Sequence, residues 1–150
     1  MKSINKDLIE VSVMADLRTK DSFTLQQEAI QLNRASNTSV IELGKRLIIL
    51  KEQCLKHSEY VKFIEEKLHL KYSTANKYVK IVRAYGLTEN NKNIELVIAL
   101  GVKKAIRLLK INNLEERLAF IKEHNLVNKS YIEIDKILNK TYPSEVKVLN

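Results

Sequence analysis

Residues 68–88 read LHLKYSTANKYVKIVRAYGLT, and they contain no Asp or Glu. The pattern predicts a turn over residues 69–72 and a helix over residues 73–85, with Ser73 as its N-cap. Gly86 stands where a left-handed residue is expected to end that helix. A further short helix is predicted over residues 58–68. Two short helices joined in this way are typical of a helix-turn-helix.

The predicted helix 73–85 divides into two faces. At 100° per residue, its apolar side chains gather on one side, with Ile81 at the boundary and Tyr85 at the margin. The members of this inner face are Ala75, Tyr78, Val79 and Val82. The opposite arc is basic and polar, and it consists of Ser73, Asn76, Lys77, Lys80, Arg83 and Ala84.

The polar arc has the chemistry of a DNA reader. The free N–H groups at a helix N-terminus favour phosphate, which suits Ser73 and Thr74. Asn76 and Lys77 lie where a recognition helix reaches base edges, since Asn bonds adenine and Lys bonds guanine. The candidate DNA-binding residues are Lys71, Tyr72, Ser73, Thr74, Asn76, Lys77, Lys80 and Arg83. The alternative is the solvated face of an ordinary helix, against which the absence of acids counts.

Residues 21–56 carry a heptad-like apolar seam. Its members recur at steps of four and three, and they are Leu25, Ala29, Leu32, Ser36, Val40, Leu43, Leu47, Leu50 and Cys54. This spacing predicts one long helix of ~35 residues, ~50 Å in length. Such a helix would suit a homodimer interface. The alternative is a core helix, kinked over residues 37–39.

The second half of the chain predicts a bundle of short helices. They are expected over residues 94–100, 102–110, 114–123 and 131–139, with Ser130 as a cap and Glu133 completing a capping box. The segment after Gly101 carries a second basic patch, formed by Lys103, Lys104 and Arg107, with Lys110 beyond it. Either this segment is the turn of a second helix-turn-helix, or it belongs to a supporting bundle with basic surface residues.

The fold class predicted is therefore all-α, with four parts. Residues 1–20 form an N-terminal arm, in which Ile9, Val11 and Val13 alternate with polar residues as in a strand, although a frayed helix or an arm that orders on a partner also fits. Residues 21–88 hold the long helix and the helix-turn-helix, and residues 89–141 the helical bundle packed on it. Residues 142–150 form a tail.

Composition limits the function classes. The net charge is +8, and residues 56–88 contribute +4 of it with seven bases and three acids, which favours a polyanionic partner. The single Cys fits a reducing, cytoplasmic setting, nucleoid- or plasmid-associated. No apolar run approaches a membrane span, so no membrane partner is expected. The sequence lacks a metal-ligand set and a phosphate loop, and the adjacent acids of Glu65–Glu66 and of Glu115–Glu116 point to different helix faces. We therefore expect no enzyme, catalytic residue, metal or cofactor.

Particular stretches of the sequence resemble two known families. Residues 41–52, 57–68 and 73–81 resemble an uncharacterised phage and plasmid helix-turn-helix family, whose members share a long first helix with the centre seen here at residues 44–47. Glu65 and His69 depart from the usual pattern, which has a small residue and a turn glycine at these positions. Residues 96–140 resemble the helical DNA-binding region of ParB-type segregation proteins, without their nucleotide-binding motif.

The resemblances imply a DNA-binding protein of a mobile element, acting in transcription regulation, copy control or segregation. Our first hypothesis is a sequence-specific reader of double-stranded DNA, present as a homodimer. The second is a protein-interaction module that inhibits or adapts a host factor on the same scaffold, so a further protein partner is part of that hypothesis. RNA binding is a lesser third option, since aromatic residues for base stacking are few.

Overall fold

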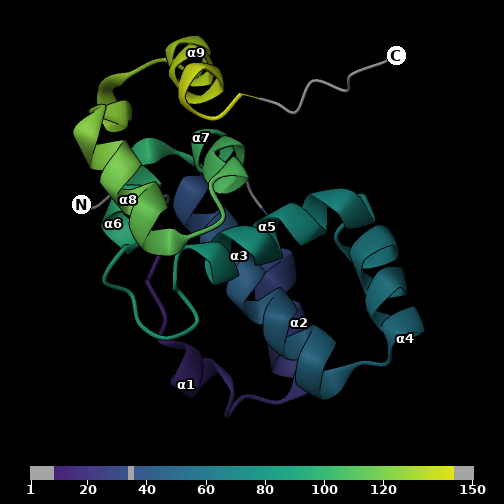
Figure 1. Cartoon of the computed structure of the whole chain (residues 1–150). Helices are drawn as coiled ribbons and strands as arrows, with labels where there is room; N and C mark the ends of the chain where they lie inside the picture. The colour runs from purple at the N-terminus through teal and green to yellow at the C-terminus, as the bar shows by residue number, and fades with distance from the viewer. Residues whose placement is uncertain (1–8, 34–35, 144–150) are drawn as a thin grey trace, which may run out of the picture.

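A computed structural model describes residues 9–33 and 36–143, and these residues form helices and connecting turns without any strand. Residues 144–150 of the expected tail and the first eight residues of the expected arm lie outside the described part. The first half contains α1 (Met14–Leu17), α2 (Ser22–Leu32), α3 (Asn37–Ile49), α4 (His57–Lys62) and α5 (Tyr72–Ala84). Figure 1 shows α3 and α5 between α4 on one side and the C-terminal helices on the other.

The prediction of one long helix over residues 21–56 is wrong. The helix α2 ends at Leu32, and α3 begins after Ser36, whose hydroxyl accepts a hydrogen bond from the Ser39 backbone N–H at 3.1 Å. A serine in this capping role starts a new helix rather than continuing the old one. The chain therefore folds back, and α2 packs along α3. Beyond Ile49, α3 continues as a π-helical turn, Leu50–Cys54.

The apolar seam is buried inside this one chain. Leu25, Ala29 and Leu47 have no exposed surface, and Leu43 is 1% exposed. The alternative interpretation of the seam, as part of the core, is confirmed for its burial, but residues 37–39 start the separate helix α3 and are not a kink within one helix. The seam is not free to join a second copy of the chain, because its own helices already cover it.

The closest helix contact in the core joins α3 to α5. A Cβ atom on Gly44 would lie 2.6 Å from the Tyr78 carbonyl oxygen and 2.9 Å from Cγ2 of Val82. Only glycine allows the two backbones this separation. The same two helices share more of the tertiary contacts than any other pair in the described part of the chain.

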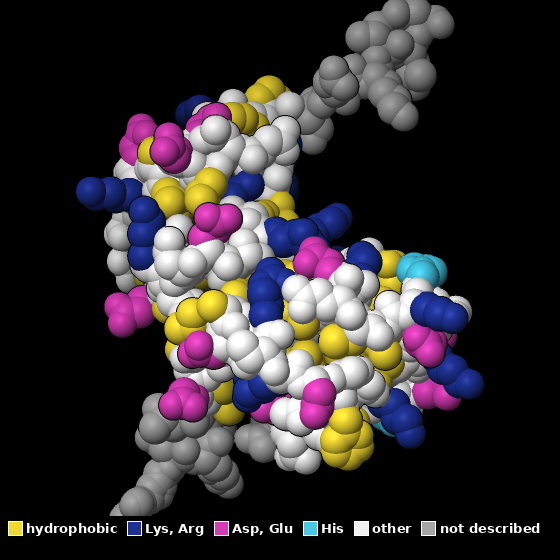
Figure 2. Space-filling model, turned by 90° about the horizontal axis from the view of Figure 1, so that it is seen from below, with side chains coloured by type: hydrophobic (Ala, Val, Ile, Leu, Met, Phe, Trp, Pro, Cys, Tyr) yellow, Lys and Arg dark blue, Asp and Glu magenta, His cyan; other side chains and the backbone are white. Residues whose placement is uncertain are grey.

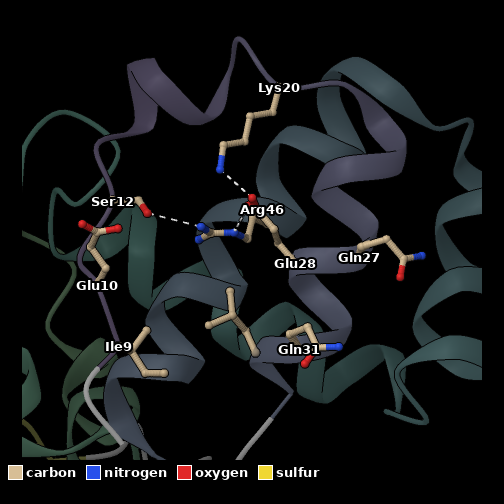
Figure 3. A pocket seen from close by; sticks show the side chains of 9 residues that line it. Ile9, Glu10, Ser12, Lys20, Gln27, Glu28, Gln31 and Arg46 are labelled. Carbon is tan, nitrogen blue, oxygen red and sulfur yellow. Dashed lines mark hydrogen bonds and ion pairs between the residues drawn. The ribbon is translucent and has the colours of Figure 1, made fainter. Parts of the chain in front are cut away.

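Next to Gly44 lies a buried ionic cluster. Glu42 and Lys45 have no exposed surface and Arg46 is 6% exposed. Lys45 Nζ lies 2.8 Å from Oε2 of Glu42, and Arg46 Nη1 lies 2.8 Å from Oε1 of the same carboxylate. Arg46 Nε also donates to Glu28 at 2.8 Å, and Glu28 in turn accepts from Lys20. Figure 3 shows the outer part of this cluster below a hollow of about 380 Å³.

Two pKa values report the environment of the cluster. Burial lowers the pKa of the Lys45 ammonium, although the hydrogen bond to Glu42 opposes that change. Burial by itself would raise the pKa of Glu28, but hydrogen bonds from Lys20 and Arg46 outweigh it, so this pKa lies below its usual value. The charged form of Glu28 is therefore the one that the fold stabilises.

The stretch before α1 is fastened to the same cluster. The backbone N–H of Ser12 donates to Glu42 at 3.1 Å, and its carbonyl accepts from Lys45 at 2.6 Å and from Asn91 at 3.0 Å. The predicted alternation is reversed here: Val11 and Val13 are 38% and 49% exposed, and Ser12 points inward. The buried ions need hydrogen-bond partners, so Ser12 turns inward against the apolar alternation, and this stretch forms no strand.

The C-terminal half consists of the short helices expected from the sequence. They are α6 (Ile94–Leu100), α7 (Val102–Arg107) with a 3₁₀ turn at Leu108–Lys110, α8 (Leu114–Glu123), and α9 (Tyr131–Thr141). Ser130 and Glu133 form the predicted capping box at the start of α9. Gly101, with φ of 96°, separates α6 from α7.

Buried polar contacts join this half to α5. The buried guanidinium of Arg117, from α8, donates to the backbone carbonyls of Ala84, Leu108 and Ile111. The Tyr85 hydroxyl donates to the Ala105 carbonyl at 2.9 Å. The end of α5 is therefore fixed against α7 and α8. None of the helices in residues 9–33 and 36–143 is both long and apolar enough to cross a membrane.

Replacing Gly44 tests the close contact of α3 with α5. We expect Gly44→Ala to lower the free energy of unfolding by about 1–3 kcal/mol, because the added methyl meets backbone atoms that cannot move aside. Urea denaturation followed by circular dichroism measures this change. Gln53→Ala, at an exposed position after α3, is the control and should leave the midpoint within error. A Gly44→Ala protein as stable as the Gln53→Ala protein would contradict the contact.

The ionic cluster predicts a pH dependence. The folded pKa of Glu28 is lowered, so its contribution to stability is present above the unfolded value of about 4.3 and is lost as the pH falls through the folded pKa. We expect Glu28→Gln to destabilise the protein by about 1–2 kcal/mol at pH 7. Urea denaturation at pH 7 and pH 3.5 should show this difference shrinking at low pH. Glu66→Gln, at an exposed carboxylate, controls for charge, and a difference that is the same at both pH values would refute the role of Glu28.

Candidate nucleic-acid interface

The two helices over residues 57–84 are joined by a tight turn. The first, α4, continues as a π-helical turn at Phe63–Lys67 and ends at the buried Leu68. His69 follows with φ of 55°, in the left-handed region that favours glycine. Leu70 then donates its N–H to the Ile64 carbonyl at 3.0 Å and packs against the core. His69 thus takes the backbone conformation for which a turn glycine is common, and the Glu65 side chain is exposed.

The helix α5 begins at Tyr72, one residue before the predicted start. Its N-cap is Lys71, which makes no side-chain cap hydrogen bond, so the prediction that Ser73 caps the helix is wrong. Lys71 has the extended backbone of an N-cap residue, and the helical residues follow directly after it, so Ser73 lies inside the first turn. The C-terminal end is as expected: Gly86 has φ of 74°, and the Leu87 N–H donates to the Val82 carbonyl at 2.9 Å.

The division of α5 into two faces is confirmed. Ala75, Val79 and Val82 are buried, and Tyr78 is half-buried against α3. Ile81, placed at the boundary, is also fully buried. The exposed side chains are those of the predicted basic arc, namely Ser73, Lys77, Lys80 and Arg83, while Thr74 and Asn76 are half-buried.

Two predicted contact residues are tied to the α4 side of the molecule. The ring of Tyr72 packs edge-on against Tyr60 at 6.2 Å and His57 at 6.0 Å, measured between centroids. Arg83 Nη2 lies 2.5 Å from Oε2 of Glu52, in an exposed ion pair. A phosphate would have to replace Glu52 to use this guanidinium. Lys77 and Lys80 therefore form the centre of the arc, together with Ser73.

The structure brings part of the second basic patch beside α5. Lys77 shares a surface hollow of about 500 Å³ with residues of α7, α9 and the 3₁₀ turn after α7. This feature, the basic hollow, is lined by Lys77, Lys103, Ile106, Arg107, Lys110 and Tyr131. Figure 2 shows several Lys and Arg side chains around the concave region near the middle of the molecule.

Contacts within the basic hollow hold its cations in place. Lys103 Nζ lies 4.7 Å from the centroid of the Tyr131 ring. Arg107 donates through Nε to Asp135 and through Nη2 to Asn139, the latter at 3.0 Å. Asp135 is not among the lining residues, but it is the acid nearest to this group of cations.

The sequence pattern places Lys104 in one patch with Lys103 and Arg107, but the structure separates it from them. Its ammonium donates to the Lys129 carbonyl at 2.6 Å and does not line the basic hollow. Successive residues on a helix point 100° apart, so Lys104 turns away while Lys103, Arg107 and Lys110 share one face. Lys110, which the sequence pattern places beyond the patch, therefore belongs with Lys103 and Arg107. Tyr131 comes from a distant helix, and nothing in its local sequence marks it.

A second hollow lies along α5 near its C-terminal end. It has a volume of about 430 Å³ and is lined by Lys80, Arg83, Ala84, Leu109, Asn112 and Arg117. Lys80 and Arg83 in this lining belong to the exposed arc itself, whereas Arg117 is the buried guanidinium of α8. Within the described ranges, no group of three or more His, Cys, Asp or Glu side chains is arranged to hold a metal ion.

Comparison with known proteins identifies the family of this chain. A family described as "Protein of unknown function (DUF3102)" matches residues 21–141, which is more than half of the chain. The chain belongs to this family. No curated protein and no solved structure matches it. The DUF3102 region begins with α2 and ends with α9, so it includes the α3–α5 contact, the turn at His69 and the basic hollow.

The turn of this DUF3102 protein can be tested directly. We expect His69→Gly to raise the free energy of unfolding by about 1 kcal/mol, because a side chain in the left-handed region is strained and glycine is not. Urea denaturation measures the change. His69→Ala keeps the strain and serves as the control, so it should show no gain. Equal stability of the Gly and Ala proteins would mean that the turn does not hold residue 69 in this conformation.

Proposed function

We propose that the protein binds double-stranded DNA in a sequence-specific manner, with α5 in the major groove. The observation on which this rests is the exposed arc of α5. It presents Ser73, Lys77 and Lys80 to solvent, and no acid occurs from residue 68 to residue 88. A helix that offers only cations, hydroxyls and amides on its free face suits phosphates and base edges.

The support of α5 favours the same proposal. Its opposite face is seated on α3 through Gly44, and its C-terminal end is fixed by Arg117 and Tyr85. A rigid helix loses little conformational freedom when it binds, which helps a reader to discriminate between sequences. In the proposed complex, Asn76 and Lys77 face base edges while Lys80 and Ser73 contact phosphates.

The biological setting is part of the proposal. The phage, plasmid and ParB-type resemblances favour transcription regulation, copy control or segregation of a mobile element. We also propose a homodimer, which would place two α5 helices about 34 Å apart on a repeated or palindromic site. Because the apolar seam is buried within each chain, the dimer interface in this proposal lies outside the seam.

The central test removes the two exposed lysines of α5. We expect Lys77→Ala combined with Lys80→Ala to weaken binding at least tenfold at 0.1 M salt, because each lysine neutralises a phosphate or contacts a base. Fluorescence anisotropy with a duplex from the upstream region of the protein's own gene, and with a scrambled duplex, measures affinity and preference. Melting curves should be unchanged, since both side chains are exposed.

A matched control separates position from charge. Lys122→Ala combined with Lys136→Ala also removes two exposed lysines, from α8 and α9, away from the exposed arc. This variant should bind nearly as the unaltered protein does. Equal affinity of the two double variants would refute α5 as the reading helix. If the unaltered protein showed neither DNA binding at moderate salt nor a preference for its own duplex, the protein-interaction hypothesis would replace this one.

A further inference from the structure

The basic hollow combines cations from both halves of the chain. Lys77 comes from α5, whereas Lys103 and Arg107 come from α7 and Lys110 from the turn after it. No acid lines the hollow, although Asp135 and Asn139 contact Arg107 beside it. Asp135 pairs with one of the four cations, Arg107, and the charge of the lining itself is positive, which favours an anionic ligand.

We propose that this hollow binds a backbone phosphate of the same duplex that α5 reads, so that α7 and α9 form a second DNA contact. This inference rests on the proposed function. Lys77 belongs both to the exposed arc of α5 and to the hollow, and therefore a strand leaving the major groove beside α5 would pass over it. Contacts of this kind set the register of a protein on DNA and add affinity without reading sequence.

The side chains are placed for such a contact. The Lys103 ammonium lies over the Tyr131 ring, which orients it without using its N–H donors on an acceptor. The volume of about 500 Å³ is many times the roughly 30 Å³ that one water molecule occupies, so a phosphodiester and its hydration fit. Lysine binds phosphate as a point charge, and three lysines and an arginine around one space supply several donors.

The ion pair of Asp135 with Arg107 allows a second, independent test of the same site. Its carboxylate pairs with Nε of Arg107, in the position that a phosphate oxygen would take. DNA therefore competes with this carboxylate for the guanidinium. Removing the negative charge should favour DNA, which is the reverse of what a purely structural ion pair would show.

The experiment compares salt dependence among variants of the full chain. The slope of log Kobs against log salt reports the number of phosphates neutralised, with about 0.9 per contact. We expect Lys103→Ala combined with Lys110→Ala to reduce the slope by about 1–2 and to lower affinity roughly tenfold at 0.1 M salt. The preference for the native duplex over the scrambled one should be kept, because these lysines would contact only phosphate. Lys122→Ala with Lys136→Ala is again the control for charge.

The gain-of-binding variant completes the test. We expect Asp135→Asn to tighten DNA binding about two- to fivefold, the range set by an exposed ion pair. Glu123→Gln, an exposed acid on α8, controls for the change in net charge. Circular dichroism melting of each variant confirms that it folds.

The outcomes distinguish this inference from the proposed function. If DNA binds and the Lys103/Lys110 variant has the slope of its control, the second contact is refuted while α5 remains the reader. If Asp135→Asn binds no better than Glu123→Gln, the competition at Arg107 is refuted. If the unaltered protein does not bind DNA at all, both proposals fail. A lowered slope with retained sequence preference, together with tighter binding by Asp135→Asn, would establish the second contact.

Discussion

The structure depends on three consecutive residues near the middle of α3, which face three different neighbours. Gly44 faces α5 and lets its backbone approach. Lys45 reaches the stretch before α1 and Asn91, and Arg46 reaches Glu28 on α2. Because residues on a helix are 100° apart, one short segment can hold three parts of the chain together. Burying two cations is costly, and the cost is offset because Glu42, Glu28 and several neutral oxygens accept their hydrogen bonds.

This arrangement explains how α5 can present one of its faces to a partner molecule. One face of the helix is fixed by backbone-to-backbone contact at Gly44, and its C-terminal end is held by Arg117 and Tyr85. The free face then needs no side chain for stability. Its lysines Lys77 and Lys80 are exposed, while α7 and the 3₁₀ turn after it add cations along one margin. Stability and the proposed recognition are thus assigned to different sides of the same helix.

Much of this could be predicted from local patterns, and the failures have physical reasons. Periodicity gave the C-terminal helices and the two faces of α5, because these depend on spacing along one element. It failed between α2 and α3, where a serine cap at Ser36 starts a new helix within an unbroken seam. It failed at Ser12, whose inward direction is imposed by buried ions from α3. Lys77 and Tyr131 line the same hollow only because of the tertiary structure, since they lie 54 positions apart and no short window of sequence contains both.

The hydrogen bond between Ser12 and Asn91 joins residues 79 positions apart in the chain. On a ribosome, where the chain emerges from its N-terminus, Lys45 is therefore made long before one of its acceptors exists. Until residue 91 has left the exit tunnel, the ammonium of Lys45 lacks that acceptor. The buried cluster is therefore completed only once the loop that contains Asn91 has been synthesised, although all its other partners lie in the first 46 residues.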